Sequence, residues 1–282
     1  MSSLRLSSNV TKLQIFRLSI PIFFSNLAIP LVGIVDTGLM GHLDSEKYLI
    51  AMSISTTFLT IIFWSFGFLR MGTIGLISQT FGKSDYRELV NIILRNIFIA
   101  IIVAFLIIIF KPVLLNIVYQ VFIVSPQTNI FINDYISIRV LSAPAELMIY
   151  VFIGFFLGIQ RTTISSALII LLSILNIFLS IYFVNTLNLN VTGVALGTVL
   201  SAYISVLFVS IFTYYFIKQK FNVILRFRKI FVKKKIIQLF NINFDIFIRT
   251  LALTFSFLWV TYLGSKLGED YLAVNTILMQ FI

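Results

Sequence analysis

A single carboxylate interrupts an apolar stretch near the amino terminus. Asp36 stands in the run IPLVGIVDTGLMGHL, whose other residues are almost all apolar or small. Burying a charged side chain in a bilayer costs about 3 kcal/mol or more, so such residues usually face a cavity, an ion or a proton path. The chemistry that Asp36 offers is the uptake and release of a proton or a cation, and other elements must position it for that exchange.

The composition places these residues in a membrane. The chain has 282 residues, of which 59% are hydrophobic and 11% are charged, whereas soluble domains have about 25% charged residues. It contains no cysteine and one histidine, which removes thiolate and histidine-cluster metal sites. No pairing of a nucleophile with a base can be recognised. We therefore expect an integral membrane protein that is not an enzyme and carries no cofactor.

Apolar segments of about 20 residues recur along the chain, and each is long enough to cross a hydrocarbon core of about 30 Å as a helix. The expected helices cover residues 15–40, 48–80, 91–119, 134–159, 162–185, 191–218 and 244–264, with an eighth beginning near 270. As a helix, residues 271–282 rise only about 18 Å. We therefore expect the eighth helix to be incomplete.

The basic residues gather on one side of this predicted topology. Fifteen of the 21 lysines and arginines lie in the amino-terminal segment and the connections on its side, whereas three lie in the opposite loops and three within spans. The positive-inside rule places the basic side in the cytoplasm. We expect a multi-pass protein of the inner (plasma) membrane with a cytoplasmic amino terminus. Topology explains the net charge of +11, and no nucleic-acid partner is expected.

A basic segment, residues 217–243, divides the chain. Its apolar residues alternate with cations, as expected of a linker that contacts membrane lipids on the anionic inner leaflet. A pattern of four residues before the linker recurs after it at an offset of 223. The matched pairs are Gly41 with Gly264, Glu46 with Glu269, Tyr48 with Tyr271 and Leu49 with Leu272. A parallel repeat of this kind is typical of transporters built from two equivalent halves.

The repeat predicts an all-α polytopic membrane protein with three parts. Residues 1–216 form a six-helix transmembrane lobe, residues 217–243 form the basic cytoplasmic linker, and residues 244–282 form the incomplete start of a second lobe, with its first helix and part of the next.

Four sequence blocks carry a family resemblance. They are LSIPIFFSNLAIPLVGIVDTGLMGHLDS, FLRMGTIGLISQTFG, RVLSAPAELMIYVFIGFFLGIQRT and NVTGVALGTVLSAY. Together they resemble the multidrug and toxic compound extrusion (MATE) family and its DNA-damage-inducible protein F (DinF) subgroup. The resemblance implies a MATE/MOP-type fold of two six-helix lobes around a central cavity. It also implies a secondary antiporter that exports small organic, often cationic, compounds in exchange for protons or Na⁺. This chain would be a C-terminally truncated member that needs the missing C-terminal lobe to be complete.

One face of the first predicted helix combines Asp36 with small and polar residues. Its members are Asn26, Pro30, Gly33, Asp36, Thr37 and Met40. Pro30 removes a backbone donor and frees the carbonyl of Asn26, which bends the helix beside that face. In the family that the chain resembles, the matching aspartate is the coupling carboxylate, so the resemblance assigns this role to Asp36. The alternative role for Asp36 is a hydrogen bond to a neighbouring helix.

Family sodium sites add residues from the fifth and sixth helices, and here Asn176 and Thr198 match them. The position four residues after Asn176, often a second aspartate in relatives, is Ser180, and a position that is acidic in the closest relatives is Ala202. Without a second carboxylate, protonation of Asp36 alone is a simpler coupling scheme than Na⁺ binding. Hydrogen bonding between helices is the alternative role for Asn176 and Thr198.

Arg70, Arg139 and Glu146 are further charged residues that lie within predicted spans. The arginines either neutralise a buried acid, for which Glu146 is the candidate, or contact an anionic group of a substrate. Two other functions stay open. A flippase for lipid-linked precursors would need several cations lining its cavity. A chain that ends within the eighth helix leaves that cavity with one wall, which is compatible with a truncated, non-functional transporter.

Overall fold

The computed structural model describes residues 12–122, 124–221 and 243–253, together with positions 232, 235, 237, 239, 255, 256 and 259. In this part of the chain, six helical stretches are long and apolar enough to cross a membrane. They are Ser19–Gly41, Glu46–Gly82, Tyr86–Ile109, Pro126–Gly158, Thr162–Thr186 and Asn190–Phe221. Their number and order confirm the six helices expected before the linker. The linker itself lies mostly outside the described residues, and the eighth helix lies wholly outside them.

Several spans are divided into shorter helices. The elements are α1 (Lys12–Gly41), α2 (Glu46–Ser65), α3 (Phe68–Gly82), α4 (Tyr86–Ile109), α5 (Lys111–Val121), α6 (Pro126–Arg139), the 3₁₀ turn η1 (Val140–Ser142), α7 (Ala143–Gly158), α8 (Thr162–Ile181), the π-helical turn η2 (Tyr182–Thr186) and α9 (Asn190–Phe221). Short breaks therefore separate α2 from α3 and α6 from α7 within single spans.

Capping residues explain where the observed helices begin. The helix expected at 134–159 starts earlier, at Pro126, because Ser125 accepts a hydrogen bond from the backbone N–H of Thr128 at 3.2 Å and proline suits the first turn of a helix. The helix expected at 91–119 starts at Tyr86, after the Asp85 side chain accepts from the N–H of Glu88 at 3.0 Å. It ends at Ile109, and α5 follows as a separate helix.

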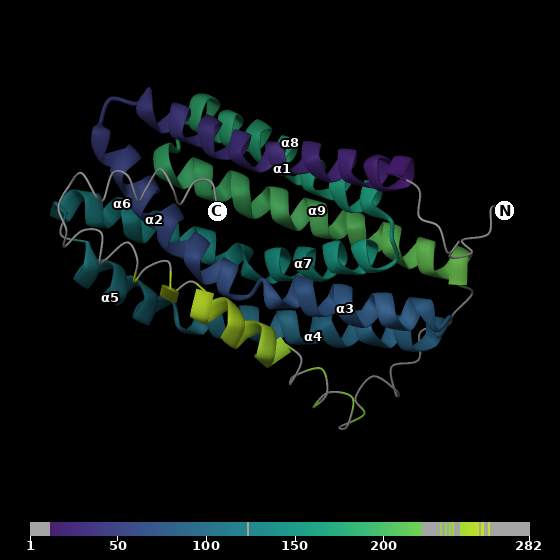
Figure 1. Ribbon diagram of the computed structural model, residues 1–282. Coiled ribbons are helices and arrows are strands. Elements are labelled where there is room, and N and C mark those ends of the chain that lie inside the picture. Colours follow the sequence, from purple (N-terminus) through teal and green to yellow (C-terminus); the bar gives the residue numbers. More distant parts are fainter. Residues whose placement is uncertain are drawn as a thin grey trace.

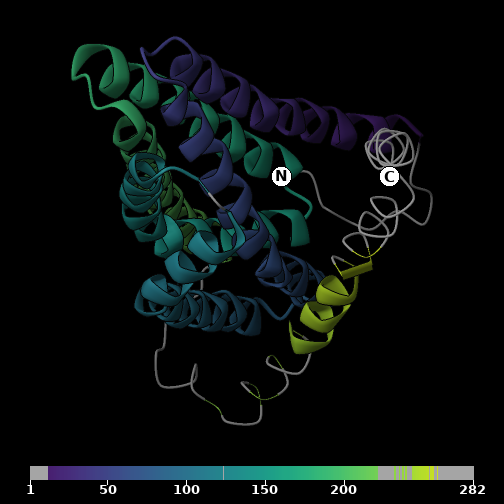
Figure 2. The ribbon, with the colours of Figure 1, turned by 90° about the vertical axis from the view of Figure 1, so that its left-hand side faces the viewer.

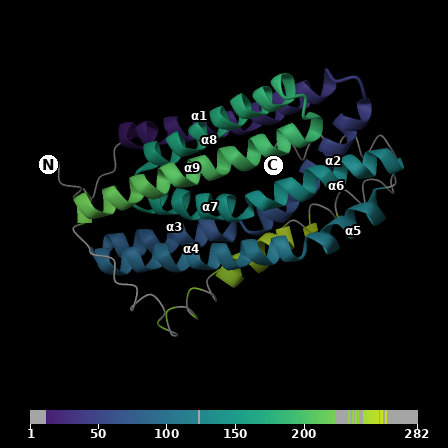
Figure 3. The same ribbon diagram turned by 180° about the vertical axis from the view of Figure 1, so that it is seen from behind.

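The helices run side by side in a bundle (Figure 1). α1 packs on α8, and α8 packs on α9, while α3 and α4 pack on α7. α9 runs between α8 and α7, and the view from behind agrees (Figure 3). α2 and α6 pack on each other, and α6 also contacts α9. Burial is uneven among the spans. In an 18-residue stretch of the span Pro126–Gly158, 67% of the residues are buried, whereas in such a stretch of the span Ser19–Gly41 only 11% are buried.

A short helical segment, residues 243–253, lies against α3 and within the predicted seventh helix (yellow-green in Figures 1 and 2). The ring of Phe247 meets the ring of Phe68 edge to face, with centroids 5.7 Å apart. The Asn243 side chain is buried against Gly72. The chain beyond the linker therefore returns to the bundle beside α3.

Glycine allows α3 and α7 to approach closely. A methyl group placed on Gly154 would lie 2.7 Å from the carbonyl oxygen of Arg70 and 2.8 Å from Cβ of Thr73. Neither atom belongs to the flexible end of a side chain, so the two helices would have to separate.

We expect Gly154→Ala to destabilise the folded protein by about 1–3 kcal/mol, the usual cost of overpacking. The matched control is Gly75→Ala in α3, where an added methyl group meets nothing within 4 Å and better helix propensity should leave stability equal or slightly higher. Thermal unfolding of the purified protein in detergent measures both changes. Equal melting temperatures for the two variants would show that the contact at Gly154 does not limit helix packing.

Candidate functional site

A cavity of about 380 Å³ lies among the helices of the bundle, and residues of α1, α2, α3, α6, α7, α8 and α9 line it. Its charged lining residues are Asp36, Arg70, Arg139 and Glu146. Asn176 and Thr198 also line it. The structure thus brings the three residues expected to couple transport and the three residues of the expected charge network to one cavity.

Asp36 is positioned by the packing of α1 on α8. The residue is 8% exposed, and its Oδ1 accepts no hydrogen bond from the described part of the chain. Ser180 of α8 lies beside the carboxylate, and Arg139 of α6 is close enough for the two charges to interact. A buried acceptor without a partner costs about 1–3 kcal/mol. An oxygen kept in that state is suited to taking up a proton or a cation.

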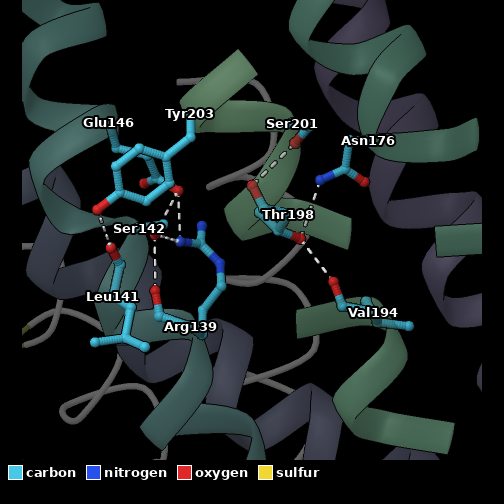
Figure 4. Close-up of polar contacts among 9 residues, drawn as sticks. All are labelled: Arg139, Leu141, Ser142, Glu146, Asn176, Val194, Thr198, Ser201 and Tyr203. Atoms are coloured by element: carbon cyan, nitrogen blue, oxygen red, sulfur yellow. Dashed lines mark hydrogen bonds and ion pairs between the residues drawn. The ribbon is translucent and has the colours of Figure 1, made fainter. Parts of the chain in front are cut away.

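Asn176 and Thr198 join α8 to α9 (Figure 4), and both line the same cavity as Asp36. The Asn176 Nδ2 donates to Thr198 Oγ1 at 3.0 Å, and the Thr198 hydroxyl donates to the carbonyl of Val194 at 3.0 Å. The Ser180 hydroxyl donates to Asn176 Oδ1 at 3.4 Å. The Thr198 hydroxyl therefore donates its only proton within α9. The Asn176 side chain links α8 to α9 and also borders the cavity.

Arg139 and Glu146 form an ion pair across the 3₁₀ turn between α6 and α7. The Ser142 hydroxyl lies between them, 3.1 Å from Glu146 Oε1 and 2.7 Å from the carbonyl oxygen of Arg139, and Arg139 also donates to it. The Arg139 guanidinium stands over the Phe63 ring, 5.1 Å from its centroid, a favourable cation–π geometry. Glu146 is thus the acid that neutralises Arg139.

The Tyr203 hydroxyl of α9 donates to the carbonyl of Leu141 within the turn at 2.9 Å (Figure 4). This hydrogen bond ties the break between α6 and α7 to α9.

Other residues of the predicted α1 face are dispersed. Met40 is fully buried in the core, and Gly33 lines the cavity. Asn26, Pro30 and Thr37 are exposed. α1 is helical on both sides of Pro30.

Two tyrosines that no sequence motif singled out also belong to the cavity. Tyr135 and Tyr150 both line it. Tyr135 precedes Arg139 by four residues and Tyr150 follows Glu146 by four, which places each on the same helix face as its charged neighbour. The four-residue spacing from a charged residue is the sequence signal that could have identified both tyrosines.

The sequence matches the MatE family over residues 21–182. It is 32% identical over 268 residues to the DNA damage-inducible protein F of Escherichia coli K12, and the match covers 95% of this chain and 58% of that protein. It is 24% identical to the multidrug export protein MepA of Staphylococcus haemolyticus, covering 69% of this chain and 43% of that protein.

A solved structure of a MOP superfamily transporter from Pyrococcus furiosus has the same fold, with a TM-score of 0.81 at 21% identity over 95% of this chain and 59% of that one. The chain therefore spans about half the length of the proteins it matches.

We expect Glu146→Gln to destabilise the protein by about 3 kcal/mol, the lower end of the cost of breaking a buried pair, because the two side chains keep only 16% and 15% of their surface exposed. The double variant Arg139→Gln with Glu146→Gln should recover part of this loss, since it leaves no unpaired charge. Thermal unfolding of the single and double variants gives the interaction free energy between Arg139 and Glu146. Additive losses would show that the pair contributes no interaction of its own.

Proposed function

The chain belongs to the MatE family, and we propose that it forms the first lobe of a secondary antiporter that exports organic, often cationic, compounds in exchange for protons. The observation that carries this proposal is the unpartnered carboxylate oxygen of Asp36 on the wall of a cavity large enough for part of a drug-sized molecule. The E. coli and S. haemolyticus relatives are longer, so the proposal concerns a complete transporter that contains this chain.

The charges on the cavity wall explain how a proton could displace a cation. Arg70 and Arg139 balance Asp36 and Glu146 while both acids are ionised. Protonation of Asp36 leaves one net positive charge on the wall. A bound cation about 4 Å from Asp36 would then lose about 4 kcal/mol of attraction at an effective dielectric constant of about 20. By linkage, a bound cation must oppose protonation by the same free energy.

Aromatic side chains supply the rest of a site for an organic cation. Phe63, Trp64, Tyr135 and Tyr150 line the cavity. Ring faces attract organic cations and tolerate differences in shape. This surface suits a transporter that accepts several compounds.

The lining favours protons over Na⁺ as the coupling ion. Among the described residues of the cavity, Asp36 is the acid without an ion-pair partner, because Glu146 is held by Arg139. The Thr198 hydroxyl oxygen accepts a hydrogen bond from Asn176 of α8, and Asn176 Oδ1 accepts one from Ser180 of the same helix. A metal cation needs several oxygen ligands at once, whereas a proton needs only the carboxylate.

The flippase alternative is not favoured by this arrangement. It calls for several uncompensated cations in the cavity, but Glu146 neutralises Arg139. We place the protein in the inner membrane with a cytoplasmic amino terminus, because the basic residues gather on that side of the six spans.

We expect Asp36→Asn to abolish proton-driven export by the complete transporter, because the amide cannot exchange a proton. Asp44→Asn, which removes an exposed carboxylate beyond the end of α1, is the matched control and should export at the wild-type rate. The export rate of each variant is measured as the efflux of a fluorescent organic cation from proteoliposomes under an imposed pH gradient. Wild-type efflux by Asp36→Asn would refute the proposal.

A second expectation concerns the driving ion. A pH gradient alone should drive export, and a Na⁺ gradient at equal pH on both sides should not. The same proteoliposomes, loaded with Na⁺ or with choline, separate the two gradients. Export that follows the Na⁺ gradient and ignores pH would assign the coupling to Na⁺.

A further inference from the structure

Three helices meet at one junction at the basic end of the bundle. α3 ends at Gly82, α4 begins at Tyr86 and α9 ends at Phe221, and these points lie at the same end of the bundle in both views (Figures 1 and 3). The Tyr86 ring stacks on the Phe221 ring, with centroids 4.7 Å apart and planes at 15°. The Phe81 ring lies 6.4 Å from the first and 6.5 Å from the second. These contacts hold the end of α9 against the turn between α3 and α4.

Four exposed cations lie within three residues of these rings in the sequence. Lys83 is the C-cap of α3, Arg87 lies in the first turn of α4, and the last turn of α9 carries Lys218 and Lys220. The two lysines of α9 were expected in the linker, but the helix continues to Phe221 and gives them fixed positions. Within the described ranges, the ion pairs of the protein involve other cations.

The acids beside the junction do not neutralise these cations. Glu88 Oε1 already accepts from buried Arg95 at 2.9 Å and from Lys235 at 3.3 Å. Asp85 is exposed, and its side chain caps α4. Four cations against the single carboxylate of Asp85 leave a net charge of +3. The C-terminal ends of α3 and α9 add only about half a negative charge each, so the surface stays positive.

The junction lies at the depth of the lipid headgroups. The spans Glu46–Gly82, Tyr86–Ile109 and Asn190–Phe221 all begin or end there, and the ends of spans lie in the interfacial region of a bilayer. Tyrosine is favoured at this depth, and basic residues are attracted there to anionic lipids. Aromatic rings beside exposed cations suit a ligand that has both an acyl chain and a phosphate.

We propose that this junction surface, formed by Lys83, Arg87, Lys218 and Lys220 around Tyr86 and Phe221, binds the phosphate groups of anionic phospholipids in the adjacent leaflet. The cations come from three helices, so a headgroup that contacts Lys83 and Lys220 joins the α3–α4 turn to α9. The inference concerns the helix ends and not the linker that follows them. It requires only the membrane spans and is independent of the proposed antiport.

Two lipids that differ only in their headgroup test the proposal. The complete transporter, purified in detergent, is mixed with equal amounts of dioleoyl phosphatidylglycerol and dioleoyl phosphatidylcholine, and native mass spectrometry measures how much of each it retains. We expect the wild type to prefer the anionic phosphatidylglycerol. The double variant Lys83→Gln with Lys220→Gln should lower this preference about fivefold or more, because a single basic residue near an anionic surface contributes about that factor.

Lys47→Gln with Lys111→Gln is the matched control. It removes the same number of positive charges from the opposite end of the bundle, where α2 and α5 begin, and it should keep the wild-type preference. A third variant, Phe221→Ala, keeps every charge but removes the ring that stacks on Tyr86. It should also lower the preference, because α9 is then held less firmly against α4.

Each contrary outcome would overturn the inference. A wild type that retains the two lipids equally has no anionic-lipid surface. Equal losses in the two double variants would assign the preference to overall charge and not to the junction. A preference unchanged in Phe221→Ala would show that the cations act separately. If sodium phosphate displaces the lipid at an ionic strength at which sodium chloride does not, the surface binds free phosphate and the assignment to lipid is wrong.

Discussion

The cost of holding the Asp36 carboxylate away from water governs the arrangement of the other charged groups. A buried acid of this kind needs nearby donors or cations to remain ionised. Ser180 on α8 and Arg139 on α6 are the groups that act on it. Arg139 also forms an ion pair with Glu146, so its charge is shared between the two acids. Asp36 therefore has a hydroxyl and a shared guanidinium nearby but no ion-pair partner of its own among the described residues.

The broken span between α6 and α7 makes this balance possible. Pro144 lies in the first turn of α7, and a proline there cannot donate the backbone hydrogen bond of a continuous α-helix. The chain forms the 3₁₀ turn η1 instead. The turn lets Ser142 contact both Arg139 and Glu146, and it offers the Leu141 carbonyl to Tyr203. A local backbone restriction thus fixes the orientation of the central ion pair.

The sequence predicts the six spans and the charged residues of the cavity, but not how the cavity is enclosed. Apolar length alone gives the spans, whereas the caps at Asp85 and Ser125 move two helix starts. Asp36 reaches the cavity because its helix face meets α8, yet Thr37 on the same predicted face is exposed. Helical periodicity groups residues by angle, and only tertiary packing decides which part of a polar face is covered. The family match, by contrast, followed directly from the sequence blocks.

Packing is uneven among the six spans of the described chain. The span that holds Arg139 and Glu146 is the most buried of the six, and the span that holds Asp36 is the least buried within the described chain. Elements with few buried contacts move at lower free-energy cost than elements at the centre of a core. A displacement of α1 would move Asp36 relative to Arg139, whose span is the most buried of the six. Such a displacement would change the distance between the Asp36 carboxylate and the Arg139 guanidinium, the charge that acts on it.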